Sequence, residues 1–220
     1  MEKRYASISA DIVSSTTLPR EKMIDLNRSI KECLELLESR YAGLWARIVR
    51  GDTIECSIAD PRDAFEIALI LKTWIKSFRT EDMADQHRFS RYGLRVAIGI
   101  GGMSTIDRSL DIMDGEAIYR SGRTLDNLSG HSKYGMTISM EQTNYEEPLN
   151  IILSLINQIL NNATPRRCEV LCRRLLSGGS QETAESFGIS VSGVNQTLYS
   201  LGWAAIEQAI RYYRKITEPL

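Results

Sequence analysis

The sequence predicts an α+β protein in which a sheet domain is followed by an all-helical domain. Up to about residue 145, β-rich runs alternate with amphipathic helical patterns, and beyond that point only helical periodicity remains. The chain has 220 residues, of which 43% are hydrophobic and 25% charged. That composition is typical of a globular protein whose chain can bury one large core or two small ones.

The first part begins with a predicted strand over residues 5–13 and a helix from Pro19 to Tyr41. Two further β-rich runs, residues 45–49 and 53–58, meet at Gly51-Asp52, a dipeptide typical of hairpin turns. A helix is expected to begin at Asp60 and Pro61, because Asp caps helices and Pro suits the first helical position. This helix should reach about residue 78.

The rest of the first part completes a recognisable order. We expect a strand over residues 92–100, a helix over 114–128 and a strand over 134–139. The order β-α-β-β-α-β is that of a ferredoxin-like domain, here with an added helix and strand. Gly99, Gly101 and Gly102 end the strand expected over residues 92–100 without the last glycine of a dinucleotide fingerprint, which favours close packing of the strand end.

A polar segment over residues 140–148, with Glu146, Glu147 and Pro148, predicts a linker. It divides the chain into a domain of residues 1–145 and a helical domain of residues 146–220. The helical patterns of the second domain cover residues 149–160, 165–176, 180–188 and 190–215.

Composition also limits the partners and the compartment. Charged or polar residues interrupt every apolar stretch, and the N-terminus lacks the apolar core of a signal peptide, so we expect no membrane partner and a cytoplasmic location. Cys168 and Cys172 share a helical face, but no His or second Cys pair completes a zinc set. The net charge is −1, yet from Thr164 onward seven Arg and Lys residues stand against five Glu residues. That weak asymmetry is in the direction that DNA binding requires.

Two carboxylates mark a candidate ligand site. Asp11 ends the first strand, and Asp52 lies in the hairpin turn. If the first strand pairs beside the hairpin, the two carboxylates meet at one edge of a sheet, where they could hold a divalent cation and its phosphates. Each residue could instead serve only its turn.

Residues 180–199 have the layout of a helix-turn-helix. Ser180 and Ser190 are expected to cap its two helices, Ala184 allows a close helix crossing, and Gly188 suits the turn. The segment resembles the C-terminal DNA-binding region of sigma factors and of related response regulators. The exposed face of the second helix would then enter the major groove, with Val191, Ser192, Asn195, Gln196 and Tyr199.

Asn195 and Gln196 could pair with adenine edges. The second helix carries no basic residue before Arg211, so the phosphate contacts are expected from the preceding helix, through Arg166, Arg167, Arg173 or Arg174. The alternative is a helical bundle used for dimerisation.

The first domain resembles the nucleotidyl cyclase and palm-type polymerase fold through residues 10–16 and 50–52. The resemblance implies that Asp11 and Asp52 bind Mg²⁺ with the backbone carbonyl of Ile12. It also implies that Ser14, Ser15 and Thr16 cradle phosphates. Arg50 stands partly in a base-reading position. The cyclase signature of Gly, Asn and Arg is represented by Gly115 and Arg123, with Tyr119 in place of Asn. Arg123 would contact phosphate, whereas the loss of Asn argues against cyclisation.

Over nearly its whole length the chain resembles the SatD family of bacterial proteins. The shared features are an Ala-Asp-Ile-Val-x-Ser start at Ala10, the Gly-Asp hairpin, an Asp-Gly-x-Ala-Ile helix start at Asp114 and the C-terminal helix-turn-helix. The resemblance implies a cyclase-like domain joined to a DNA-binding tail.

Three functions are consistent with these patterns. The first is a bacterial regulator whose cyclase-like domain binds a nucleotide and whose tail binds DNA. The second is an active cyclase or nucleotidyltransferase with a helical dimerisation tail. The third is an interaction module without activity. A homodimer is expected by analogy with cyclases.

Overall fold

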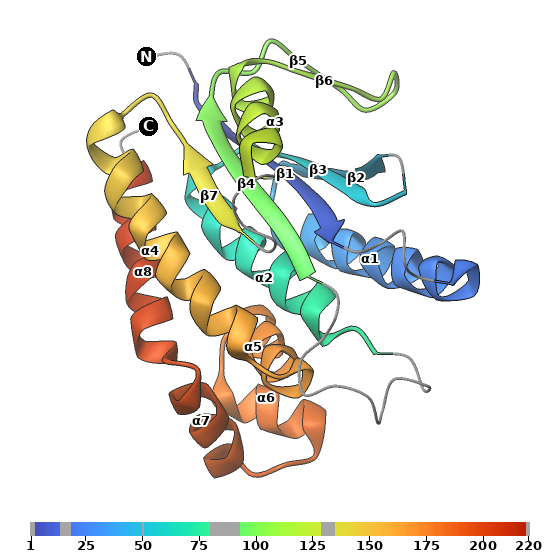
Figure 1. Ribbon diagram of the computed structural model, residues 1–220, viewed down its shortest axis with the longest axis vertical. Coiled ribbons are helices and arrows are strands. Elements are labelled where there is room, and N and C mark those ends of the chain that lie inside the picture. Colours follow the sequence, from blue (N-terminus) through green and yellow to red (C-terminus); the bar gives the residue numbers. More distant parts are fainter. Residues whose placement is uncertain (1–2, 14–18, 50, 80–92, 129–134, 219–220) are drawn as a thin grey trace.

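The computed structural model describes residues 3–13, 19–49, 51–79, 93–128 and 135–218. The fold is α+β and is built on a mixed sheet of five strands in the order β2-β3-β1-β4-β7 (Figure 1). The strands are β1 (Tyr5–Val13), β2 (Leu44–Val49), β3 (Thr53–Ile58), β4 (Gly93–Gly101) and β7 (Met136–Ser139). Only β4 and β7 run parallel, and the other neighbours are antiparallel.

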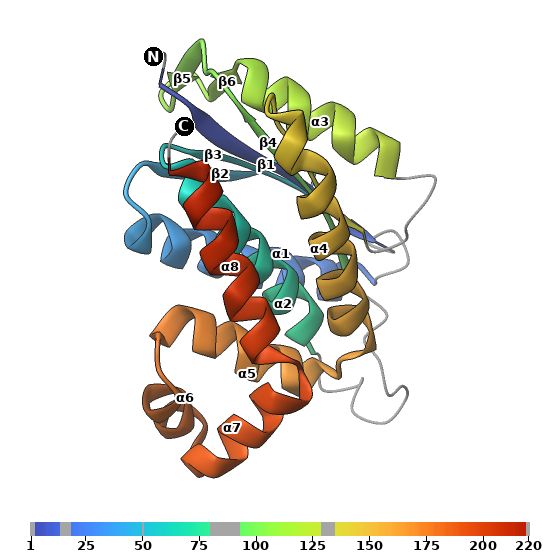
Figure 2. The ribbon, with the colours of Figure 1, turned by 90° about the vertical axis from the view of Figure 1, so that its left-hand side faces the viewer.

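The two faces of the sheet are covered by different elements because β1 alternates in character. Ile8, Ala10 and Ile12 face a hydrophobic core shared with α1 (Arg20–Arg40) and α2 (Ala64–Ser77), which follows the 3₁₀ turn η2 (Pro61–Asp63). Ser7 and Ser9 point to the opposite face, which α3 (Glu116–Leu128) covers. Figure 2 shows α3 on one side of the sheet and the two earlier helices on the other.

The helices that follow the sheet pack onto its first helical layer. They are α4 (Thr143–Asn162), α5 (Pro165–Ser177), α6 (Ser180–Phe187), α7 (Val191–Ser200) and α8 (Trp203–Thr217). Helix α5 lies against α2, while α8 contacts α2, α4 and η2 (Figures 1 and 2). Their buried side chains belong to the same hydrophobic cluster as the sheet core. None of the described helices is both long and apolar enough to span a bilayer.

The linker expected over residues 140–148 is wrong, because α4 already begins at Thr143. Its first turns are fixed to the edge strand β7, where Glu146 accepts a hydrogen bond from Met140 N at 2.7 Å. Asn150 also accepts from Ile138 N and donates to Ile138 O, both at 2.9 Å. These contacts satisfy backbone groups at the β7 edge of the described sheet. The division of the chain at residue 145 therefore falls inside a helix.

Three other local expectations need correction. The helix expected over residues 190–215 is two helices, because Gly202 adopts φ 66°, a left-handed conformation that suits glycine. Ser180 starts α6 but does not cap it, since Gly179 is the N-cap residue and no side chain caps this end. A two-stranded hairpin, β5 (Thr105–Asp107) and β6 (Ile112–Asp114), also precedes α3 and was not expected.

Candidate ligand and nucleic-acid sites

The structure brings the end of β1 beside the β2–β3 hairpin, as the sequence predicted. Asp11 lies opposite Thr53 on β3 and opposite Arg95 on β4. Ile12 N donates a hydrogen bond to Asp52 O at 3.1 Å, which holds the backbone of the hairpin turn next to the strand end. The backbones of Asp11, Ile12 and Asp52 are therefore close together.

The carboxylate of Asp11 is engaged by a side chain that the sequence reasoning did not single out. Arg95 Nε donates to Asp11 Oδ1 at 2.8 Å, and the NH2 nitrogen of Arg95 contacts Asp11 Oδ2. Both side chains are 21% exposed. The hydrogen bonds to Asp11 raise the pKa of Arg95, so the guanidinium stays charged. Strand pairing makes this contact across 84 positions of sequence, which no local motif reveals.

The donor chemistry at this edge is that of an Mg²⁺ site, since carboxylate and carbonyl oxygens are the usual ligands. However, both oxygens of Asp11 are in contact with Arg95, and Asp52 Oδ1 accepts a hydrogen bond from Thr53 at 3.5 Å. Among the described residues, no group of three His, Cys, Asp or Glu side chains could hold a metal ion. The arrangement thus fits a cation only if Arg95 releases Asp11.

Of the residues expected to contact phosphate or the base, the structure describes Arg123. Ser14, Ser15, Thr16 and Arg50 lie outside the described residues. Arg123 is exposed on α3, two positions after Ser121, whose side chain is buried against the sheet. Two positions correspond to about 200° around a helix, so Arg123 is on the side of α3 that faces away from the sheet.

Tyr119, for which the sequence resemblance predicted the Asn position of a cyclase, makes a hydrogen bond to Asp114. Its hydroxyl donates to Asp114 Oδ1 at 2.5 Å, which raises the pKa of Tyr119 and lowers that of Asp114. This contact joins α3 to the end of β6.

Helix α3 approaches the sheet closely over the glycines that end β4. A Cβ atom at Gly99 would lie 2.2 Å from Ala117 O and 2.5 Å from Ser121 N. The Ser121 hydroxyl lies 3.0 Å from that of Ser7 and 2.8 Å from that of Ser9, in a buried polar cluster. The expectation that these glycines serve close packing is confirmed.

Helices α6 and α7 are joined by a short turn at Gly188, where φ is 61°. Ser190 caps α7, because its Oγ accepts a hydrogen bond from Gly193 N at 3.1 Å, as predicted. Val194 and Leu198 are buried on the inner face of α7, and Ala184 of α6 is also buried. These contacts fix which face of α7 is turned outward.

That outer face carries polar side chains. Ser192, Asn195, Gln196 and Tyr199 are exposed, and Tyr199 is 88% exposed. Val191, also expected on this face, is instead half-buried and packs against the core, since it starts the helix beside the turn.

The arginines of α5 differ in their surroundings. The Arg166 guanidinium lies over the Phe187 ring, 4.3 Å from its centroid, and pairs with Glu169 at 2.9 Å. Arg167 and Arg173 are exposed. Arg174 is only 18% exposed and stacks on Trp203, 4.8 Å from the ring centroid, so it ties α5 to α8 rather than facing solvent.

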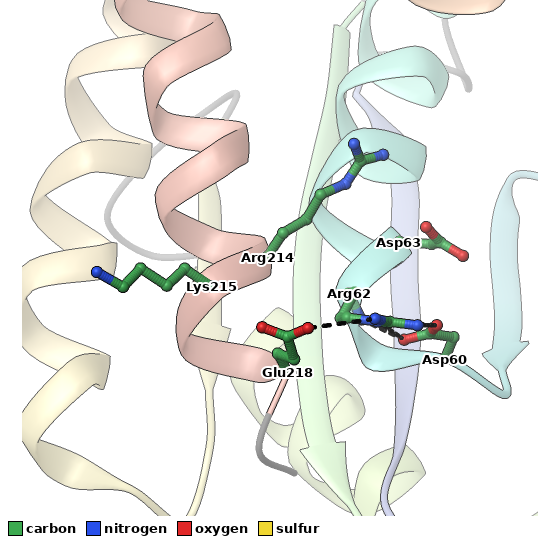
Figure 3. Close-up of a pocket in the computed structure, with 6 residues that line it drawn as sticks. All are labelled: Asp60, Arg62, Asp63, Arg214, Lys215 and Glu218. Carbon is green, nitrogen blue, oxygen red and sulfur yellow. Dashed lines mark hydrogen bonds and ion pairs between the residues drawn. The ribbon is translucent and has the colours of Figure 1, made fainter.

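A hollow of about 330 Å³ lies between η2 and the end of α8 (Figure 3). Arg62 pairs with Asp60 at 2.6 Å and lies 4.0 Å from Glu218, while Lys215 points away from the other lining side chains. The lining residues are Asp60, Arg62, Asp63, Arg214, Lys215 and Glu218. Acidic and basic groups balance there, so the hollow has no preference for one sign of ligand charge. The sequence indicated only a helix start at this point.

No protein-family model matches the sequence, and no curated protein matches it. Among solved structures, one similar chain is described as a bacterial light-regulated adenylyl cyclase. It has a TM-score of 0.44 and 18% identity, and the match covers 62% of this chain and 75% of that one. A second structure with the same description has a TM-score of 0.42 and 18% identity, over 61% of this chain and 42% of that one. Both similarities are weak.

Proposed function

We propose that the protein is a DNA-binding regulator of the SatD type, with α7 as the recognition helix and the sheet domain as the receptor for a nucleotide. The observation that carries the DNA-binding part is the outer face of α7. Its exposed Asn195, Gln196 and Tyr199 are supported from beneath by the buried Val194 and Leu198. Asn and Gln can each make a bidentate contact with adenine in the major groove.

The position of α7 supports this proposal. Helices α6 and α7 lie at the end of the molecule that is remote from β5 and β6 (Figure 1). A duplex could therefore reach α7 without meeting the sheet.

The phosphate contacts would come from α5. Arg166 and Arg173 are seven residues apart and share one face of that helix. The contact of Arg166 with Phe187 puts this face next to the turn that precedes α7. Arg167 adds a further exposed guanidinium. These side chains supply the charge that α7 lacks.

The ligand part of the proposal concerns the ends of β1 and β3. Asp11, Asp52 and the carbonyl of Ile12 would hold Mg²⁺, and Ser14, Ser15, Thr16 and Arg50 would contact the nucleotide. The hydrogen bond from Ile12 N to Asp52 O supports a common site for the two acidic residues.

The DNA-binding part is tested by titrating fluorescent duplex DNA with the full chain at about 50 mM salt. We expect binding that the double change Asn195→Ala and Tyr199→Ala weakens by at least about tenfold, since both side chains lie on the proposed contact face. Gln208→Ala, an exposed polar change on α8, is the matched control and should leave affinity unchanged. Equal effects of the two variants, or no binding by the parent chain, would reject the proposal.

The alternative is an active cyclase or nucleotidyltransferase whose helical part only dimerises. The same pair of carboxylates would favour it. It predicts pyrophosphate release from a nucleoside triphosphate with Mg²⁺ or Mn²⁺, lost in Asp11→Asn. The regulator proposed above instead predicts nucleotide binding without the release of pyrophosphate.

A further inference from the structure

Arg95 and Asp11 form a cross-strand ion pair at the expected cation position. They are directly opposite each other on antiparallel strands, and the guanidinium reaches both carboxylate oxygens. Side-by-side contact of this kind is the strongest geometry available to an arginine and a carboxylate. With both side chains 21% exposed, the pair is also partly shielded from water and salt.

A second pair on the same face of the sheet provides a comparison. Arg47 on β2 lies opposite Glu55 on β3, with Nε and NH2 3.1 and 2.8 Å from Glu55 Oε2. The side chains of this pair are 22% and 25% exposed, much like those of the first pair. Arg47 also pairs with Asp111, so it fastens the β5–β6 hairpin to the sheet. It therefore has a structural task that is visible in the fold.

Within the described part of the chain, the side-chain hydrogen bonds and ion pairs of Arg95 are confined to Asp11, so Arg95 does not fasten a further element to the sheet. A guanidinium in contact with both carboxylate oxygens fills the place where a cation would bind and repels any divalent ion that approaches. With both oxygens engaged by the guanidinium, Asp11 is a weaker ligand for a second cation than a free carboxylate would be.

We propose that Arg95 is an internal competitor of the divalent cation for Asp11, so that a ligand enters this site by exchange: Arg95 leaves the carboxylate as the cation arrives. The released guanidinium is then available to an anionic group of the ligand, such as a phosphate, because arginine recognises phosphate with the same paired donors. This inference rests on the proposed ligand site and names the residue that sets its cation affinity.

The test measures Mn²⁺ binding to the full chain by isothermal titration calorimetry. Arg95→Gln removes the competing charge and should lower the Kd for Mn²⁺ by at least about tenfold, which is about 1.4 kcal/mol. Arg47→Gln is the matched control. Its position is two strand spacings, about 10 Å, from β1, which is beyond the Debye length at about 0.15 M salt, so the Kd should stay within about twofold.

Asp11 must be the group that gains the cation. In the double variant Arg95→Gln, Asp11→Asn, the tighter Mn²⁺ binding should disappear. Arg95→Lys, which keeps the charge but loses the paired donors, should show a smaller decrease in Kd than Arg95→Gln. If Arg95→Gln does not fold, Arg95→Lys takes its place in the Mn²⁺ titration. The unfolding temperature of each variant shows whether it is folded.

The inference is overturned if Arg95→Gln binds Mn²⁺ no more tightly than the parent chain, including the case in which neither binds. It is also overturned if the double variant keeps the gain. Failure of the proposed ligand function is a separate result: Arg95→Gln would gain Mn²⁺ binding while no nucleoside triphosphate stabilises either protein.

Discussion

Lys72 of α2 is a basic side chain buried in the core, with only 2% exposure. Its Nζ donates a hydrogen bond to Leu94 O at 2.7 Å. Burial is the main reason that its pKa falls from 10.5 to about 7, with a smaller effect of the neighbouring Lys76 and an opposing one of Cys168. The protein therefore holds a lysine that loses its proton near neutral pH.

The lowered pKa of Lys72 predicts a dependence of stability on pH. Between pH 7 and 10.5 the unfolded chain binds a proton that the folded chain has lost, so this residue makes stability rise with pH over that window. The slope is at most about 1.4 kcal/mol per pH unit. Below pH 7 both states are protonated and the cost of burying the charge is fully present.

Lys72→Met should consequently gain stability relative to the parent chain at pH 7, and the gain should shrink by pH 9. Chemical unfolding at both pH values measures it. Lys31→Met, at a lysine side chain that is 74% exposed on α1, should show no such pH-dependent difference. If the difference in free energy of unfolding between Lys72→Met and the parent chain does not change with pH, the lowered pKa of Lys72 is contradicted.

At the scale of single elements, α3 packs closely on the sheet because β4 has glycine, without a side chain, at the contact. Gly99→Val would place a Cβ atom 2.2 Å from Ala117 O and 2.5 Å from Ser121 N, so we expect it to lower the free energy of unfolding by about 3 kcal/mol or more. Gly122→Ala on α3 has open space around the added atom, and it should stabilise the protein by up to about 1 kcal/mol. Urea unfolding measures the free energy of unfolding of both variants. A change in the same direction for Gly99→Val and Gly122→Ala would contradict the packing described.

A buried hydroxyl group adds to the packing of helix α8 against η2. Tyr213 is 1% exposed and donates to Pro61 O at 2.9 Å. Tyr213→Phe should cost about 1 kcal/mol of unfolding free energy, because it leaves a buried carbonyl without this donor. Tyr212→Phe, next to it and 37% exposed, should change stability by less than about 0.5 kcal/mol. If thermal unfolding shows the same loss for both, the hydrogen bond does not hold α8.

The elements that the sequence predicted well are those with strong local signals. The run of apolar and small residues in β1, the Gly51-Asp52 turn and the helical stripe of α1 all lie within short windows. The β5–β6 hairpin was missed because its strands have three residues each and show no clear alternation. The linker was mispredicted because its polar composition hid the start of α4 and contacts such as that of Glu146 with Met140 N, which exist only in the folded chain.

The candidate sites follow the same division. The cap and the outer face of α7 are local features, and the sequence correctly indicated the cap at Ser190 and the exposure of Asn195 and Gln196. The pairing of Asp11 with Arg95 depends on the register between β1 and β4, and a single sequence does not contain it in any local form.

At the scale of the whole molecule, α2 lies between the two proposed sites. Lys72 binds the carbonyl of Leu94, the residue before Arg95, and Lys76 Nζ donates to Asn161 O near the end of α4 at 2.6 Å. On its other side α2 packs against α5, which carries the arginines proposed for DNA. The sheet and the later helices share one core. A change at Arg95 on ligand binding could therefore bias the position of the α5–α7 unit.

We propose that the five-stranded sheet with its ligand site and the helices α5, α6 and α7 act together as a ligand-controlled DNA-binding protein. The most direct measurement is the affinity of the full chain for duplex DNA with and without each of the four nucleoside triphosphates and Mg²⁺. We predict that at least one of them changes the Kd by about fivefold or more, a coupling of about 1 kcal/mol. A Kd that stays within about twofold for all four, or no DNA binding in any condition, would contradict the claim.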